Sequence, residues 1–355
     1  MSDKNLARRT AVEVAFGGVD ITSSIRPYLL SVTYTDNEED EADDLQLKLQ
    51  DREGIWMEKW LANAVEAAAD ATGLQIQAVF LRQNWRGDGG DKLLDTGVFE
   101  LDSVKASGPP STITIKGTSL PYNSQIRQTK KTKAWESYNL SGIAREIAST
   151  GGMVCMYQSA QDPFYERTEQ FEQSDIAFLS RLCHDAGISL KATNNLLVLF
   201  DQAQFEQKAP VFTIAKGDGT YTKYDLSIGT AGTKYSSCRV RYEDPATGQV
   251  ISGIAYAEDY KENSKNNQQL EVHAKVASVG EAQTLAAKRL RLHNKYSRTA
   301  SFTFPGDPDK VAGVTVTLTG WGSWDGKYII TQSKHALGTS GYTTQVSLRR
   351  ILEGY

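Results

Sequence analysis

The hydrophobic pattern of this chain changes period twice, and this change constrains the fold more than any other feature of the sequence. From residue 10 to about residue 119 apolar and polar residues alternate, the period that places one face of a β-strand on a core and the other in solvent. From about residue 135 to residue 200 the period is 3.6, and from residue 213 onward alternation returns. The sequence therefore predicts two strand-rich ends separated by a helical middle.

The first part predicts six short strands with polar turns between them, the pattern of a barrel or sandwich. Their alternating apolar positions are Val12, Val14 and Phe16; Leu30, Val32 and Tyr34; Leu45, Leu47 and Leu49; Ile76, Ala78 and Phe80; Phe99, Leu101 and Val104, with a bulge; and Ile113 and Ile115. Between the third and fourth strands, the alanine-rich stretch 56–72 has helical spacing and ends at Gly73. We expect this helix to cap an open barrel end.

The middle part predicts a compact α/β unit. A first helix is expected from the apolar stripe Leu140, Ile143, Ala144 and Ile147. A second begins after the N-cap Ser174, ends before Gly187, and turns Ile176, Leu179, Leu182 and Cys183 inward. Two apolar runs, 188–192 and 196–200, flank Asn194-Asn195, which is a hairpin signal because Asn tolerates positive φ.

The last part predicts strands, one helix, then strands. The strand positions are Cys238, Val240 and Tyr242; Ile251, Ile254 and Tyr256; Phe302 and Phe304; Val314, Val316 and Leu318; 328–330; and 342–348. A capping box at Ser278 and Glu281 opens a helix to about Asn294, with Leu285, Ala286 and Leu290 inward. One echo links the two ends: residues 95–101 and 324–330 each hold a glycine followed two and four positions later by an aromatic and an aliphatic residue, which suggests an internal repeat.

Composition narrows the class of protein. A chain of 355 residues suits two or three domains, and 40% hydrophobic with 23% charged residues is typical of globular proteins. No run reaches the roughly 18 apolar residues of a membrane span, and the polar start offers no signal core, so we expect a chain made and kept in the cytoplasm unless an assembly or lysis carries it out. A net charge of −4 gives no general attraction to nucleic acid, which favours protein partners.

A search for catalytic chemistry yields no catalytic, cofactor or metal site. Cys183-His184-Asp185 contains the residue types of a nucleophilic triad, but consecutive helical residues point to different faces, so we expect a buried Cys183 beside two solvated neighbours. The other cysteines, Cys155 and Cys238, are read as small buried hydrophobes. His273, His293 and His335 lack metal-ligand spacing, and the glycine-rich stretch 85–91 is expected to be a hairpin tip.

Two charged groups are the candidate assembly or lumen surface. One is acidic and consists of Asp36, Glu38, Glu39, Asp40, Glu41, Asp43 and Asp44; the other is basic and includes Arg289 and Arg291 on the exposed side of the third helix. The acidic run could hold calcium, repel DNA from a channel wall, or be a solvated loop; it lacks the spacing of a calcium loop. The basic run favours a salt-bridged subunit interface or a solvated face over nucleic-acid binding.

Several phrases resemble the phage late control protein D family, the hub proteins of contractile tails. They are residues 31–36 and 43–51 with Trp56 and Trp60, residues 140–148, Pro305-Gly306, Ala312-Gly313, residues 326–330, His335 and Gly341-Tyr342. The most specific phrase is residues 172–182, which resembles the family's Gln-x-Ser-Asp-x-x-Phe-Leu-x-Arg-Leu. The chain departs from many relatives in its alanine-rich segment 61–72, which leaves the shape of that barrel rim open.

The resemblance implies a homotrimer in which each chain contributes two tube-like barrels, so that three chains present six units to a sixfold tail tube and bind a central spike. The expected fold is α+β, mainly β, with a first tube-like β-barrel domain at 1–125, a small α/β insert at 126–205 and a second barrel at 206–355. The expected partners are the tail tube protein, the central spike protein and other baseplate proteins, with no stable nucleic-acid binding, a lumen open to passing DNA, and no membrane insertion.

The resulting hypothesis is a non-enzymatic structural hub, without cofactor, located in the tail baseplate of a virion or phage-tail-like particle and assembled in the bacterial host cytoplasm. Two alternatives remain open at this point. One is a cell-wall glycan hydrolase, although no specific carboxylate pair marks it. The other is a peptidoglycan-binding module, suggested by Trp135 and the two-helix insert, which is faintly similar to LysM modules.

Overall fold

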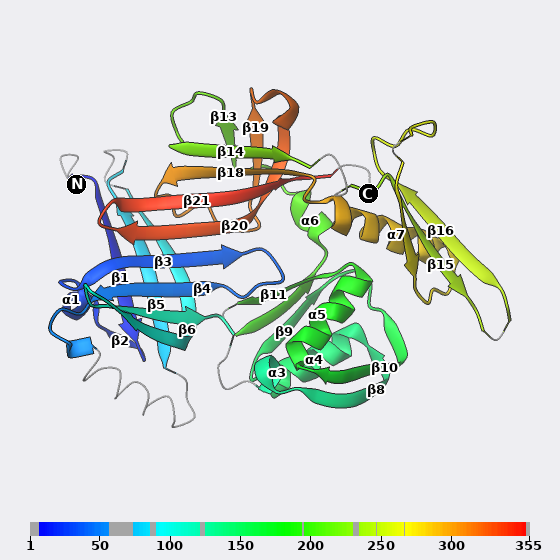
Figure 1. Cartoon of the computed structure of the whole chain (residues 1–355), viewed down its shortest axis with the longest axis horizontal. Coiled ribbons are helices and arrows are strands. Elements are labelled where there is room, and N and C mark those ends of the chain that lie inside the picture. The colour runs from blue at the N-terminus through cyan, green and yellow to red at the C-terminus, as the bar shows by residue number, and fades with distance from the viewer. Residues whose placement is uncertain are drawn as a thin grey trace.

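The computed structural model describes residues 7–56, 74–85, 90–120, 125–193, 195–229, 234–245, 247–265 and 267–352. One long sheet dominates this part of the chain and runs through both strand-rich ends (Figure 1). Its thirteen strands are β1 (Arg9–Phe16), β2 (Val19–Asp20), β3 (Leu29–Asn37), β4 (Asp44–Gln50), β5 (Gln75–Gln83), β6 (Asp91–Ser107), β7 (Thr112–Thr118), β13 (Phe212–Ala215), β14 (Lys223–Ile228), β18 (Arg298–Pro305), β19 (Thr315–Thr319), β20 (Gly326–Gly338) and β21 (Gly341–Arg350).

The strand order is β14-β18-β21-β20-β3-β4-β7-β6-β5-β1-β2, with β13 and β19 attached beside β20. The two ends of the chain meet where β3 pairs antiparallel with β20. Alternation explains why these segments form strands: Leu45, Leu47 and Leu49 are fully buried on one face, while Gln46 and Lys48 lie on the other. The long sheet is therefore apolar on one face and polar on the other.

Two apolar cores lie against this sheet. The first gathers side chains of the N-terminal strands, including Val32, Leu47 and Phe80, and it also takes in Tyr342 from β21. The second is built on the C-terminal strands, with Phe302 at its centre. Because Tyr342 belongs to the C-terminal half of the chain but packs in the N-terminal core, the two halves interlock.

The middle of the chain folds around a third core. Its elements are α3 (Gln125–Gln128), β8 (Lys131–Asn139), α4 (Leu140–Thr150), β9 (Val154–Gln158), β10 (Phe164–Gln173), α5 (Asp175–Ala186), β11 (Ser189–Thr193) and β12 (Leu196–Phe200). Ser174 caps α5 by accepting a hydrogen bond from the Ala177 amide, and Gly187 ends it in the left-handed region at φ 68°. Both predicted helices and the predicted hairpin are confirmed.

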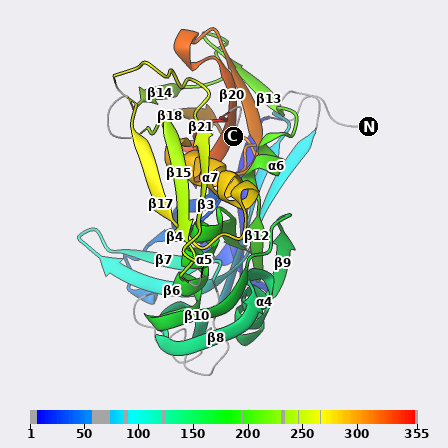
Figure 2. The ribbon, with the colours of Figure 1, turned by 90° about the vertical axis from the view of Figure 1, so that its right-hand side faces the viewer.

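A fourth core lies at the far end of the molecule. A short helix, α6 (Gln202–Glu206), leads from the insert toward the C-terminal strands. Beyond β14, the chain forms β15 (Ser237–Glu243), β16 (Val250–Tyr256), β17 (Gln269–His273) and α7 (Val279–Asn294), and Figure 2 shows α7 beside these strands. Ala282, Ala286 and Leu290 are buried on the inner side of α7, as the sequence predicts, while Leu285 is only partly buried.

The prediction of a mainly β fold is confirmed, and so are the six N-terminal strands and the bulge after Leu101. The expected helix at 56–72 lies outside the described residues except for Trp56, which is buried, and of the expected hairpin tip at 85–91, residues 86–89 lie outside them as well. The sequence pattern missed several strands, namely β8, β9, β10, β13, β14 and β17. No helix in the described part of the chain has the length and apolar character needed to cross a membrane.

A buried ionic junction as the candidate functional site

The acidic run covers the end of β3, the turn after it and the start of β4, and its side chains contact the insert, the end of α7 and β21. Asp36, Glu38, Glu39 and Asp43 are buried, each with at most 9% of its surface exposed. Since these four side chains are covered by other parts of the same chain, the expectation that they form an outer assembly or lumen surface is wrong. The long sheet positions them: β3 and β4 are neighbours, and the turn between them is pressed against the insert.

The first contact joins the acidic run to β11 of the insert. The Lys191 ammonium lies 2.7 Å from Asp36 Oδ1 and 3.6 Å from Asp43 Oδ1, and it donates to the Asn37 carbonyl oxygen at 2.6 Å. Asp36 also accepts from the Ala312 amide at 2.8 Å. One lysine of the insert is therefore held by a carboxylate that also contacts the C-terminal half of the chain.

The second contact brings in the end of α7. Glu39 forms an ion pair with Lys295 and accepts a hydrogen bond of 2.5 Å from the Ser189 hydroxyl. Ser189 belongs to the insert, and Lys295 directly follows α7. Glu39 thereby ties together the N-terminal strands, the insert and the α7 unit.

The third contact is a chain of four charges. Arg349 of β21 is fully buried, and its guanidinium lies 3.2 Å from Glu38 Oε1 and 2.6 Å from Glu206 Oε1. Glu206, at the end of α6, also pairs with Arg291 of α7. Buried charges are tolerated only when they are paired. These four paired charges therefore fix the relative position of α6, α7 and the long sheet.

Burial shifts the proton affinities of these carboxylates. It raises the pKa of Glu38 to about 7, although Arg349 opposes the shift, and it raises the pKa of Asp43 to about 6 against the opposing effect of Lys191. Burial also disfavours the charged form of Glu39, but the Lys295 ammonium outweighs it and the pKa of Glu39 lies below its usual value. Glu38 is therefore the member of the junction that titrates closest to neutral pH.

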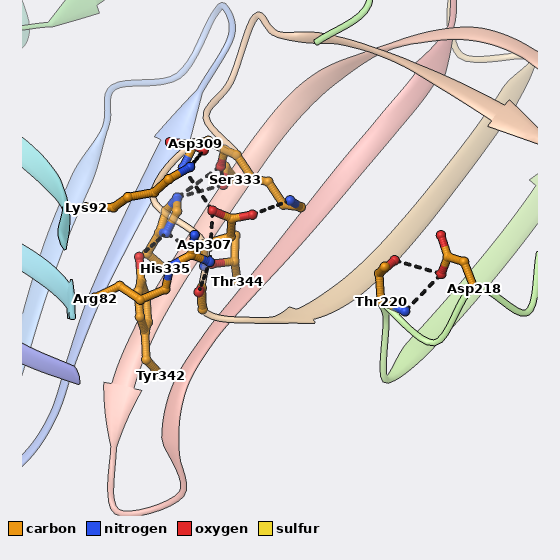
Figure 3. A network of polar contacts seen from close by, with 12 residues as sticks. Arg82, Lys92, Asp218, Thr220, Asp307, Asp309, Ser333, His335, Tyr342 and Thr344 are labelled. Atoms are coloured by element: carbon orange, nitrogen blue, oxygen red, sulfur yellow. Dashed lines mark hydrogen bonds and ion pairs between the residues drawn. The ribbon is translucent and has the colours of Figure 1, made fainter. Parts of the chain in front are cut away.

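A second polar network links the N-terminal strands to the segment after β18, and Figure 3 shows it from close by. Arg82 of β5 lies 3.1 Å from Asp307, whose amide donates to the Thr344 hydroxyl at 2.9 Å. His335 is fully buried, 2.8 Å from the Tyr342 hydroxyl oxygen. Burial lowers the pKa of His335 to about 4, so this ring is a neutral structural group at physiological pH.

The remaining predicted surface residues divide between two environments. Asp40 and Glu41 are exposed and Asp44 is half-buried, so their role as an assembly or lumen surface stays a prediction. Arg289 does not lie on a free helix face, because its guanidinium contacts the His184 ring at 2.8 Å and Asp185 at 3.0 Å. The predicted salt-bridged interface is thus, for Arg289 and Arg291, a contact between parts of one chain.

The three triad-type residues of α5 do not converge, as expected from helical geometry. Cys183 is buried in the core of the insert, and its burial raises the pKa of the thiol. His184 and Asp185 are exposed and bind Arg289. Of the other cysteines, Cys238 is buried as expected and Cys155 is half-buried. Within the described ranges, no group of three or more His, Cys, Asp or Glu side chains is arranged to hold a metal ion.

Sequence reasoning did not identify Lys191, Arg349 or Glu206. They form ion pairs with residues that lie 85 or more positions away in the chain, so no local period or motif marks them. The sequence carried one signal for this site: seven acidic residues within nine positions must be surrounded either by solvent or by cations. The sequence alone did not show which of these two surroundings they have.

A family model described as phage tail baseplate hub (GPD) matches residues 121–341 of the chain, from the insert through to the start of β21. The chain belongs to this family. The match spans the residues of the junction contributed by the insert, α6 and α7, but not the acidic run or Arg349.

Two curated relatives are described as probable baseplate hub proteins. The protein of Escherichia phage 186 is 25% identical over 248 residues, which cover 68% of this chain and 59% of the relative. The protein of Escherichia phage P2 is 26% identical over 233 residues, covering 64% of this chain and 55% of the relative. The matched stretch thus spans less than three fifths of either relative.

Solved structures share the fold. The tail protein from Neisseria meningitidis MC58 superposes with a TM-score of 0.67 at 12% identity, covering 96% of both chains. The 43 kDa tail protein of prophage MuSo2 from Shewanella oneidensis gives 0.62 at 15% identity, covering 96% of this chain and 97% of that one. An Escherichia coli protein described as a component of the type VI secretion system gives 0.56 at 11% identity, over 96% of this chain and 78% of the other.

Proposed function

We propose that the chain is the structural hub of a contractile tail or tail-like particle, a homotrimeric ring that joins a sixfold tail tube to a threefold central spike. One observation carries the proposal: the N-terminal and C-terminal strands repeat the same spatial order within one sheet. A chain that holds two similar units presents six of them when three copies assemble. Such a ring matches the symmetry of a sixfold tube on one side and of a threefold spike on the other.

The proposed architecture is two tube-like β-barrel domains, 1–125 and 206–355, with an α/β insert at 126–205. The first and second cores would be the interiors of the two barrels. The third core corresponds to the insert, while the fourth, formed by β15, β16, β17 and α7, is a further unit carried between β14 and β18. The ionic junction would hold the insert and this further unit at fixed positions on the ring.

The proposed hub works by shape and strand pairing, without bond chemistry or cofactor. Its support is that the buried carboxylates of the junction are each paired with a cation of the same chain and that burial favours the protonated form of the Cys183 thiol. The proposed partners are the tail tube protein, the central spike protein and other baseplate proteins, in a virion tail baseplate assembled in the host cytoplasm. DNA would pass through the ring without stable binding.

Electron microscopy of the purified chain, combined with mass measurement, tests the ring. The expected particle contains three copies and shows six similar lobes around a channel. Pull-downs with tail tube and spike proteins from the same genome test the two faces. A protein that remains a single chain and captures neither partner would overturn the proposal, and lysis of peptidoglycan that is lost on one Asp or Glu substitution would favour the hydrolase instead.

A further inference from the structure

The two strand-rich ends follow one connection pattern. In the first unit the spatial order is β1-β5-β6-β7-β4-β3, and in the second it is β13-β19-β20-β21-β18-β14. With the two-residue β2 left out and the strands numbered by appearance within each unit, each order reads first, fourth, fifth, sixth, third, second. The units differ at the first strand, because β1 pairs antiparallel with β5 whereas β13 pairs parallel with β19.

The register of pairing agrees residue by residue. Thr35 lies opposite Asp44, which lies opposite Thr118, which lies opposite Glu100. In the second unit the matching row is Ser227, Thr299, Arg349 and Ile329.

One bulge agrees as well. The register shifts between Leu101 and Ser103 of β6 and between Ile330 and Gln332 of β20. These positions are equally far from Gly97 and Gly326, the glycines of the sequence echo. On this alignment Lys105 of β6 corresponds to Lys334 of β20, so the echo marks equivalent strands.

The second unit has one pairing that the first unit lacks. Along its edge away from β21, β20 pairs first with β19 and then, from Gln332 to Gly338, with β3 of the first unit. In this pairing Lys334 lies opposite Thr35, and His335 lies opposite Tyr34. β3 therefore completes an edge that the second unit leaves open.

The equivalents of these two partners are the end of β6 in the first unit and β14 in the second, and among the described residues both have an open edge. On its edge away from β7, β6 pairs with β5 only as far as Glu100, and within the described residues no backbone hydrogen bond is made along that edge from Ser103 to Ser107. The strand equivalent to β3 is β14, which pairs with β18 alone among the described strands. Most of β14 is exposed, and Tyr224 keeps 49% of its surface accessible.

We infer that β14 of one copy adds to the open edge of β6 in the next copy, repeating between chains the β3–β20 pairing found within the chain. The internal pairing fixes the register: Ser227 lies opposite Lys105, and Asp225 lies opposite Ser107. Diagonal neighbours across strands are within reach of long side chains, so the Lys105 ammonium can pair with the Asp225 carboxylate.

The side chains on the core face of the two edges also match. The same register sets Ile228 opposite Val104 and Leu226 opposite Ala106. Ile228, Val104 and Leu226 are half-buried in the single chain, and Ala106 is exposed. Pairing would remove their remaining apolar surface from water and would satisfy the unpaired backbone groups of both edges.

This inference rests on the proposed ring and specifies its contact. The contact is head to tail, since each copy donates β14 and accepts at β6, and contacts of this type form a closed ring only when the rotation per copy closes. Equivalence between the internal and external junctions makes every step around the ring the same, which gives six alike units from three chains.

Paired cysteines in the full chain test the contact. Facing Cα atoms of antiparallel strands are about 4.5–5.5 Å apart, inside the range that a disulfide bridges. The variant Ser227→Cys with Lys105→Cys should give covalent dimers and trimers after mild oxidation. The matched control, Ser227→Cys with Ser107→Cys, shifts the register by two residues to about 7–8 Å and should cross-link at least about tenfold less.

The outcomes separate the contact from the function. A ring of three chains in which the facing pair cross-links no better than the shifted pair refutes the β14–β6 contact and leaves the hub intact. Cross-linked chains that grow into open polymers support the contact but refute the ring of three. A chain that stays single and forms no cross-link refutes both.

Discussion

Arg349 offers the sharpest test of the buried junction. Replacing it with Met keeps most of the side-chain volume but removes the cation that faces both Glu38 and Glu206. Breaking a buried ion pair by deleting one partner costs about 3–5 kcal/mol, because the remaining charge is left without compensation. Here two carboxylates lose a partner, although Glu206 keeps Arg291. We therefore expect Arg349→Met to lower the free energy of unfolding by about 3–5 kcal/mol at pH 8.

The matched control is Arg167→Met, which removes an arginine whose ion pairs with Glu136 and Glu169 are exposed. Exposed pairs contribute about 0–1 kcal/mol, so this variant should unfold close to the wild type. Urea unfolding followed by circular dichroism at pH 8 and at pH 5.5 measures both. At the lower pH the Glu38 carboxyl can take up a proton, and the deficit of Arg349→Met should shrink. A loss no larger than that of the control, or one that does not change with pH, would refute the idea of a junction held by buried charge.

Three further predictions concern other parts of the structure. Because burial raises the pKa of Glu38 to about 7, its stabilising contribution of about 3 kcal/mol is fully present below pH 4.5 and is lost as pH rises from 4.5 through 7. Glu38→Gln should therefore flatten the fall of the urea midpoints between pH 4.5 and 7.5, and an unchanged slope would contradict this. The pKa of His335 is lowered to about 4, so its contribution runs the opposite way and is lost as pH falls from 6.5 through 4; His335→Gln should unfold with less change across that window. A Cβ on Gly253 would lie 2.4 Å from the Gln283 amide nitrogen of α7, so Gly253→Ala should lower the melting temperature through a cost of about 1–3 kcal/mol, whereas Gly280→Ala, with no atom nearer than 3.9 Å, should not.

Periodicity predicted those elements whose two faces meet different environments. β4 alternates because Leu45, Leu47 and Leu49 lie in the core while Gln46 and Lys48 face away. α5 was predictable for a similar reason, with a capping serine and a terminating glycine added. By contrast, β8 and β10 pair only with each other among the described strands, and β8 buries Trp135 alone, so neither strand carries a clear period of two.

The contacts of the candidate site could not be predicted from short stretches of sequence, for another reason. Charge patterning correctly located an unusual segment after β3, but it could not predict burial because the compensating cations come from β11, the end of α7 and β21. Only the assembled fold brings Lys191, Lys295 and Arg349 to this segment. The internal repeat was visible in the sequence as one glycine echo, since the strands around that glycine share a register but few residue types.

The pairing of β3 with β20 has a consequence for how the protein is made. Asn37 and Gln332 are hydrogen-bonded partners 295 positions apart, so β3 emerges from the ribosome long before its neighbour exists. Contacts of such long sequence separation slow folding, and an unpaired edge strand is a template for mispairing with other chains. Until β20 has been synthesised, β3 is an open edge, and on the inferred contact β14 is the edge left for a second copy once β20 has paired with β3. Completion of the chain would thereby come before assembly.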